Sequence, residues 1–128
     1  DGLGARRVAV AMLTGWITLR SAVSEDAHFT WIWRNEESTR RYFTDPAAIS
    51  LSSHQAWWNA TLKNGNRFLL IAEIFGEPVG VLRFDVDQSE ATISIYLKPE
   101  LTGVGIGPRL LLEGKTWVVD NIPTTVLP

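Results

Sequence analysis

The sequence contains no cysteine, one methionine and only two histidines among its 128 residues. The lack of cysteine excludes disulfide bonds, thiolate metal sites and a covalent cysteine intermediate. It also suits a reducing compartment, so we expect a cytoplasmic protein. Because the two histidines lie far apart in the chain, we predict no metal site.

Long hydrophobic runs and a strong charge of one sign are missing as well. No stretch of about eighteen apolar residues occurs, so we expect no membrane span. The formal net charge is −2 and the basic residues are scattered, which argues against binding to a nucleic-acid backbone. With 45% hydrophobic and 20% charged residues, the composition is typical of one compact domain.

The middle of the chain predicts three consecutive strands. Residues 68–75 form a nearly continuous apolar run, and residues 79–86 follow a Gly-Glu-Pro turn. After a second turn, residues 91–97 alternate apolar and polar side chains. Short turns between strands favour an antiparallel meander.

Helices and further strands are predicted around this meander. A strand over 16–20 precedes a helix that Ser24 caps, and the pattern Ser52-Ser53-His54-Gln55 is a capping box that begins a second helix. A third helix follows a glycine-rich segment, and 124–127 begin a strand that should pair in parallel. The expected fold class is α+β, with a mixed, mostly antiparallel sheet flanked by helices.

Both ends of the chain suggest a segment of a longer polypeptide. Residues 1–14 read as a lead-in without an initiator Met or a signal peptide, and residues 15–128 as the domain itself. The last residues, NIPTTVLP, stop inside the expected final strand. We therefore expect a C-terminally incomplete fold, whose uncovered sheet edge and helix face would favour a homodimer or destabilise the domain.

The glycine-rich segment Thr102-Gly103-Val104-Gly105-Ile106-Gly107 carries the clearest chemical signal. It lies between a predicted strand and a predicted helix, where free N–H groups can converge on an anion such as a phosphate. A tight strand-to-helix turn is the simpler alternative, but it does not need three glycines. Pro108 and Arg109 stand where a Walker A loop needs Lys and Ser or Thr, and the preceding meander contradicts a dinucleotide fold.

This segment resembles the loop of the GNAT N-acetyltransferase superfamily, Q/R-x-x-G-x-G/A, and the order of predicted elements is similar from about Trp16 to Leu127. The resemblance implies that acetyl-coenzyme A is the cosubstrate. The loop would hold its pyrophosphate, and the preceding strand would pair with its pantetheine. The coenzyme-binding residues expected on this basis are Ile95, Tyr96, Leu97, Thr102, Gly103, Val104, Gly105, Ile106, Gly107 and Arg109. The chain departs from the pattern at Thr102 and Val104, which we expect to weaken coenzyme affinity.

Two clusters in the first two long helices suggest the acceptor site. The stretch WRNEESTRRY…ISLSSHQAWW resembles a GNAT subgroup that acetylates nucleotide-linked amino sugars, including the enzyme of pseudaminic acid biosynthesis. In some bacteria that domain is fused behind a sugar-nucleotide hydrolase, whose tail the lead-in resembles. Aromatic rings and polar side chains suit a sugar, although the tryptophans could equally form core. The candidate substrate-binding residues are Trp33, Arg34, Asn35, His54 and Trp57.

The resemblance implies direct attack of a primary amine on the acetyl thioester. Backbone N–H groups near Tyr96 and Leu97 can polarise the thioester carbonyl, and Glu90 or His54 are the candidate general bases. The family's usual acid, a tyrosine, would lie beyond Pro128, so we expect weak turnover or none. Two alternatives stay open: a catalytically inactive acyl-coenzyme A-binding module and a partner-binding module with the same fold.

Overall fold

The computed structural model describes residues 16–122 and contains a four-stranded sheet in the order β1-β2-β3-β4. All three neighbouring pairs are antiparallel. The strands are β1 (Ile17–Ser21), β2 (Arg67–Ile74), β3 (Glu77–Asp87) and β4 (Glu90–Leu97). The predicted meander is confirmed. The parallel strand expected at 124–127 and the lead-in over 1–14 fall outside the described residues.

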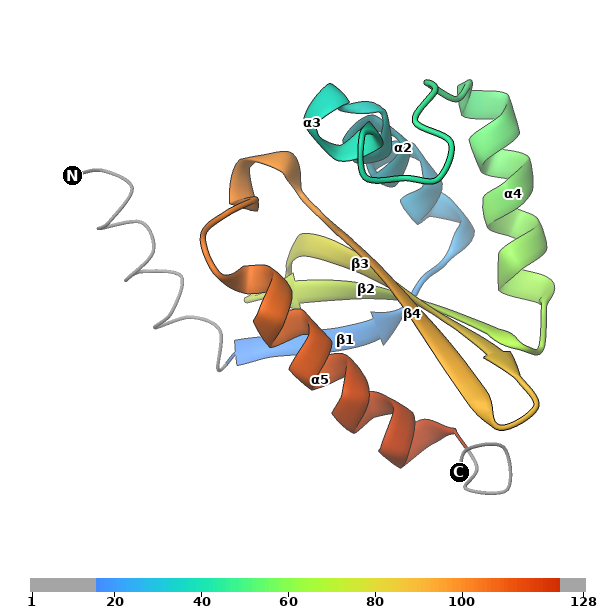
Figure 1. The fold of residues 1–128 in the computed structure, drawn as a ribbon, viewed down its shortest axis with the longest axis vertical. Coiled ribbons are helices and arrows are strands. Elements are labelled where there is room, and N and C mark those ends of the chain that lie inside the picture. The colour runs from blue at the N-terminus through green and yellow to red at the C-terminus, as the bar shows by residue number, and fades with distance from the viewer. Residues whose placement is uncertain (1–15, 123–128) are drawn as a thin grey trace.

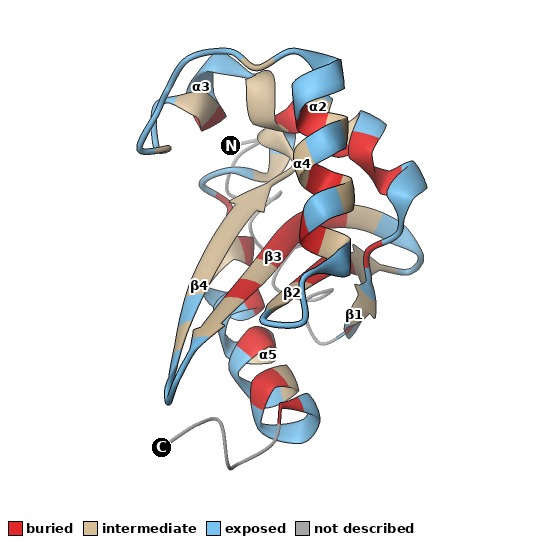
Figure 2. Cartoon of the chain, turned by 90° about the vertical axis from the view of Figure 1, so that its right-hand side faces the viewer, coloured by how far each residue is buried: buried red, intermediate tan, exposed pale blue. Residues whose placement is uncertain are grey.

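Helices cover both faces of this sheet, as Figure 1 and Figure 2 show. Among residues 16–122, one face carries α2, α3 and α4 and the other carries α5, which gives this part of the chain three layers. The helices are η2 (Ser24–Asp26), α2 (Ala27–Asn35), α3 (Glu37–Arg40), α4 (Leu51–Lys63), η3 (Pro99–Leu101) and α5 (Ile106–Asn121). Within residues 16–122, no helix is long and apolar enough to cross a membrane.

The alternation of side chains along the strands produces two hydrophobic cores, one on each face of the sheet. In β2 and β3, Leu70 and Leu82 pack against α5, whereas Ile71 and Val81 pack against the α2–α4 layer. The α5 helix comes very close to the sheet at Gly114, where an added Cβ would lie 2.9 Å from Leu82 Cδ2. Because both faces of the central strands are buried, their sequences read as nearly continuous apolar runs.

The starts of two helices differ from the sequence prediction. Ser24 does not cap the first helix: it begins the short η2, and the buried Asp26 carboxylate accepts the Val23 N–H at 2.9 Å. The predicted capping box at Ser52 is also wrong, because α4 begins at Leu51 and Ser50 is its cap. The Ser50 hydroxyl accepts the Ser53 N–H at 3.2 Å. In each case a polar side chain near the predicted cap accepts a free N–H at the start of the helix.

Candidate functional site

The glycine-rich segment forms a tight connection from η3 into the N-terminus of α5. Gly103 and Gly105 have positive φ angles of 80° and 97°, which side chains other than glycine rarely adopt. Gly105 caps α5 and offers no side chain to its first N–H groups. These amides and the helix dipole are therefore available to an anion, as the sequence predicts.

Two apolar residues fix this loop to the core. Val104 and Ile106 are 4% and 1% exposed and pack in the same cluster as Leu110. Their side chains are thus structural, and only their backbone groups can reach a ligand. Thr102 and Arg109 are exposed on either side of the loop, so their side chains are free to contact one.

The strand that leads to this loop has an open edge within the described part of the chain, because β4 is the last strand of the sheet. The Lys98 N–H donates to the Val79 carbonyl at 2.9 Å, so Lys98 points its backbone groups toward β3. Antiparallel strands alternate in this respect, and Ile95 and Leu97 therefore direct their N–H groups toward the open edge. Backbone donors lie directly before the anion-binding loop.

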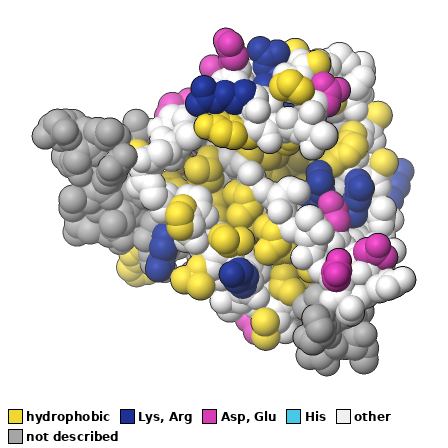
Figure 3. All heavy atoms as spheres, in the orientation of Figure 1, with side chains coloured by type: hydrophobic (Ala, Val, Ile, Leu, Met, Phe, Trp, Pro, Cys, Tyr) yellow, Lys and Arg dark blue, Asp and Glu magenta, His cyan; other side chains and the backbone are white. Residues whose placement is uncertain are grey.

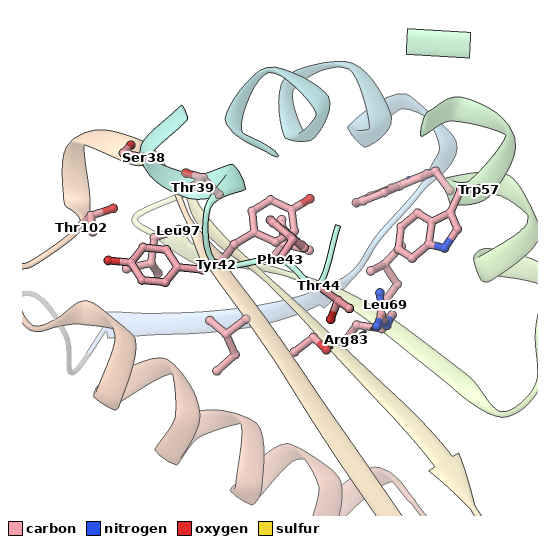
Figure 4. Close-up of a pocket in the computed structure, with 15 residues that line it drawn as sticks. Ser38, Thr39, Tyr42, Phe43, Thr44, Trp57, Leu69, Arg83, Leu97 and Thr102 are labelled. Carbon is pink, nitrogen blue, oxygen red and sulfur yellow. Dashed lines mark hydrogen bonds between the residues drawn. The ribbon is translucent and has the colours of Figure 1, made fainter. Parts of the chain in front are cut away.

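A pocket of about 480 Å³ opens on the α2–α4 side of β4. Figure 3 shows apolar side chains gathered in the hollow between α5 and the helices of the opposite face. In Figure 4, Thr102 and Ser38 lie at one end of the pocket and Trp57 and Arg83 at the other, with Phe43 between them. The lining residues are Ser38, Thr39, Tyr42, Phe43, Thr44, Trp57, Trp58, Leu69, Val81, Arg83, Ser94, Ile95, Tyr96, Leu97 and Thr102.

The pocket and the loop are continuous. Tyr96, Leu97 and Thr102 line the pocket, and Thr102 directly precedes Gly103. Burial raises the pKa of the Tyr96 hydroxyl well above its ordinary value, while Thr30 and the charges of Arg34 and Arg83 act in the opposite direction. Tyr96 is therefore neutral at physiological pH and can donate or accept a hydrogen bond.

The structure separates the predicted acceptor residues. Trp57 lines the pocket. Trp33 is only 8% exposed and packs edge-on against Phe29, with 4.9 Å between the ring centres. The Asn35 amide donates to the Ile49 carbonyl at 2.7 Å and accepts the Ile49 N–H at 3.0 Å. Asn35 thus holds the connection before α4 and does not line the pocket.

Arg34 lies behind the pocket wall. Its guanidinium carbon is 4.4 Å from the centre of the Phe43 ring, and Phe43 itself lines the pocket. The Arg34 Nη1 atom is buried and has no hydrogen-bond partner among the described residues. This arrangement places a positive charge close to the pocket without exposing it there.

His54 is a core residue between α2 and α4, with only 1% of its surface exposed. Its Nε2 atom lies 3.2 Å from the Thr30 hydroxyl oxygen, and that hydroxyl lies 2.8 Å from the Asp26 carbonyl, to which it donates. Since Thr30 has one proton to give, His54 Nε2–H is the donor in their contact. Burial, assisted by the charge of Arg34, lowers the pKa of His54 to about 4.

Glu90 lies at the far end of β4. It is exposed and faces Asp87 across the β3–β4 turn, six residues before Tyr96. That separation corresponds to about 20 Å along a strand. Neither candidate base, Glu90 or His54, lines the pocket.

Sequence reasoning missed the residues that make most of the pocket. Tyr42, Phe43 and Thr44 come from the loop after α3, which the sequence marks only as a connection. Arg83 and Ser94 face each other across β3 and β4. A usable signal for Arg83 existed, because it is a charged residue between the fully buried Leu82 and Phe84 of a central strand.

The fold and the site define an α+β domain with an anion-binding loop beside an open strand edge and an adjoining pocket. Residues 18–124 match the model of the acetyltransferase (GNAT) family. The chain belongs to this family. No curated protein sequence matches it.

Solved structures with the same fold support this assignment. The spermidine N-acetyltransferase of Vibrio cholerae, in complex with CoA and spermine, has a TM-score of 0.74 and 17% identity, covering 84% of this chain and 66% of that one. AAC(6')-Ib in complex with ribostamycin and coenzyme A has a TM-score of 0.73 and 19% identity, covering 82% and 68%. A domain from Methanocaldococcus jannaschii has a TM-score of 0.68 and 18% identity, covering 81% and 70%. The chain spans about two thirds of the length of these structures.

Proposed function

We propose that this domain transfers an acetyl group from acetyl-coenzyme A to a primary amine. The observation that carries the proposal is the continuity of the anion-binding loop, the open β4 edge and the pocket. N–H groups of the loop from Gly103 to Gly107 would hold the pyrophosphate, with Arg109 at its rim. Two of the solved neighbours named above, the spermidine N-acetyltransferase and AAC(6')-Ib, are complexes with coenzyme A and an amine, which supports the same class of reaction.

In the proposed reaction the amine nitrogen bonds to the carbonyl carbon of the thioester, the carbon–sulfur bond breaks, and the sulfur takes a proton as the amine loses one. The Ile95 and Leu97 N–H groups at the open edge would donate to the carbonyl oxygen as its negative charge develops. The pocket would hold the amine beside that edge. Glu90 and His54 have no part in this mechanism, because neither side chain lines the pocket.

We further propose that the acceptor is an amino sugar linked to a nucleotide. The Trp57 ring offers an apolar face for a sugar, and Thr39, Thr44 and Ser94 offer hydroxyl groups in the same pocket. The proposal includes a cytoplasmic location, which suits a chain without cysteine.

Calorimetric titration with acetyl-coenzyme A tests the cosubstrate, with NADH as the control ligand. We expect micromolar binding of the coenzyme alone and a loss of at least tenfold in Gly105→Val, because valine does not tolerate the φ of 97° at this position. Equal binding of acetyl-coenzyme A and NADH would refute the proposal, because the site would then not be specific for the coenzyme. No binding of acetyl-coenzyme A by a folded sample would also refute it and would favour a partner-binding module.

A further inference from the structure

We infer that the acceptor carries an oxyanion, a phosphate or a carboxylate, and that Arg83 binds it and thereby determines acceptor specificity. This inference rests on the proposed function and deepens it. The first observation is the position of Arg83, which is half-buried on β3 with its guanidinium in the pocket wall. Figure 4 shows it beside Trp57 at the end of the pocket farthest from Thr102.

The Arg83 side chain is held in place without using all its donors. Its Nε atom lies 3.1 Å from each oxygen of Asp85, and its Nη2 donates to the Ser94 hydroxyl at 3.3 Å. Its guanidinium carbon lies 5.3 Å from the centre of the Trp57 ring. These contacts fix the plane of the guanidinium, and further N–H groups of its five remain for a planar oxyanion.

The charge around Arg83 is positive. Asp85 is shared by two guanidinium groups, because Arg67 Nε also lies 3.3 Å from its Oδ1 atom. Two positive charges against one negative charge leave this cluster with a net charge of +1. Arg34, behind the Phe43 ring, adds a second positive charge next to the pocket.

No balancing carboxylate lines the pocket among the described residues: its lining contains neither Asp nor Glu. Two of the named solved neighbours hold spermine and ribostamycin, which carry several amino groups. A polycation in this pocket would meet Arg83, lie near the charge of Arg34, and find no carboxylate among the described lining residues, which costs several-fold in affinity at least. An amine that also bears an oxyanion would instead gain a charge-assisted, bidentate contact.

Matched pairs of amines test this inference by binding alone, so its result does not depend on turnover. Glucosamine 6-phosphate is compared with glucosamine, and serine with ethanolamine, each pair differing by one anion; spermidine serves as the polycation. Binding is followed by tryptophan fluorescence, because Trp57 lies against Arg83. We expect at least a tenfold preference for the anionic member of one pair, and the pair that shows it identifies phosphate or carboxylate as the anion.

Substitutions then assign the preference to Arg83. Arg83→Gln should abolish it, Arg83→Lys should retain part of it, and the matched control Lys63→Gln, at the exposed end of α4, should leave it unchanged. Asp85→Asn removes the competing carboxylate and should tighten binding of the anionic amine, a gain that misfolding cannot produce. A lack of preference in both pairs, tighter binding of spermidine, or a preference that survives Arg83→Gln would overturn the inference. Failure of the proposed function would appear separately, as a lack of acetyl-coenzyme A binding.

Discussion

The burial of His54 predicts a specific dependence of stability on pH. Its pKa falls from an ordinary value of 6.5 to about 4 in the folded protein. The unfolded chain therefore binds a proton between these two pH values and the folded protein does not, so stability is lost as the pH falls through this window. A difference of about 2.5 pKa units corresponds to about 3 kcal/mol when complete, of which about 2 kcal/mol is reached at pH 5.

Urea denaturation of the wild type and of His54→Gln at pH 7.5 and pH 5 measures this loss. Glutamine places an amide nitrogen near the position of Nε2, so it can keep the contact with Thr30 but does not titrate in this range. We expect the wild type to lose about 2 kcal/mol more than the variant between the two pH values. His28→Gln is the matched control, because His28 is exposed on α2 and its removal should leave the wild-type loss in place.

Asp26 also titrates in acid, but it is present in all three proteins and cancels in the comparison. Burial alone would raise the pKa of Asp26, and the hydrogen bonds from Arg20 and the Val23 N–H outweigh it and lower the pKa. Equal losses in the wild type and His54→Gln would refute the reasoning, since they would mean that His54 is protonated in the fold or is accessible to water.

Three further changes test the packing that positions the site. Asp26→Asn breaks an ion pair in which both Arg20 Nη atoms lie 2.8 Å from the carboxylate, and should lower the free energy of unfolding in urea by about 2 kcal/mol. The expected loss is smaller than for a fully buried pair because Arg20 is partly exposed. Gly80→Val should cost about 2 kcal/mol or more in thermal unfolding, because even a Cβ there would lie 2.6 Å from Leu110 Cδ1; a stabilised variant would contradict this packing. Trp58→Phe removes the indole N–H that donates to the Val23 carbonyl at 2.8 Å, and should lower the free energy of unfolding in urea by about 2 kcal/mol. An unchanged urea midpoint would contradict this, because it would mean that a water molecule replaces the lost hydrogen bond.

Much of the fold could be predicted from the sequence because its signals are local. The turns at Gly76-Glu77-Pro78 and Asp87-Gln88-Ser89 mark the boundaries of β2, β3 and β4 to within two residues of the structure. Each of these features depends on residues adjacent in the chain.

The acceptor side depended on tertiary packing and could not be predicted in the same way. Trp57 and His54 are three residues apart on α4, yet Trp57 lines the pocket and His54 lies against α2. Which helix face meets α2 is decided by the neighbour and not by the sequence of α4 itself. Asn35 was a reasonable candidate for a sugar, but the loop at Ile49 uses both ends of its amide.

The departure from the family pattern at Val104 now has a physical explanation. A side chain at this position is 4% exposed and packs beside Ile106 and Leu110. Valine at 104 therefore strengthens the anchor of the loop and leaves the backbone N–H groups where an anion can meet them. Weaker coenzyme affinity, if measured, should be traced to Thr102 instead.

The two-residue alternation of β4 assigns different tasks to neighbouring positions. Ile95 and Leu97 pack against the α5 core and point their backbone donors to the open edge, while Ser94 and Tyr96 belong to the wall shared with Arg83. Under the proposed function, coenzyme and acceptor are thus recognised by interleaved residues of a single strand. Substitutions at Ser94 and Tyr96 would then change which acceptor binds, while Ile95 and Leu97 continue to bind the coenzyme. The acceptor can therefore change during evolution without loss of the coenzyme site.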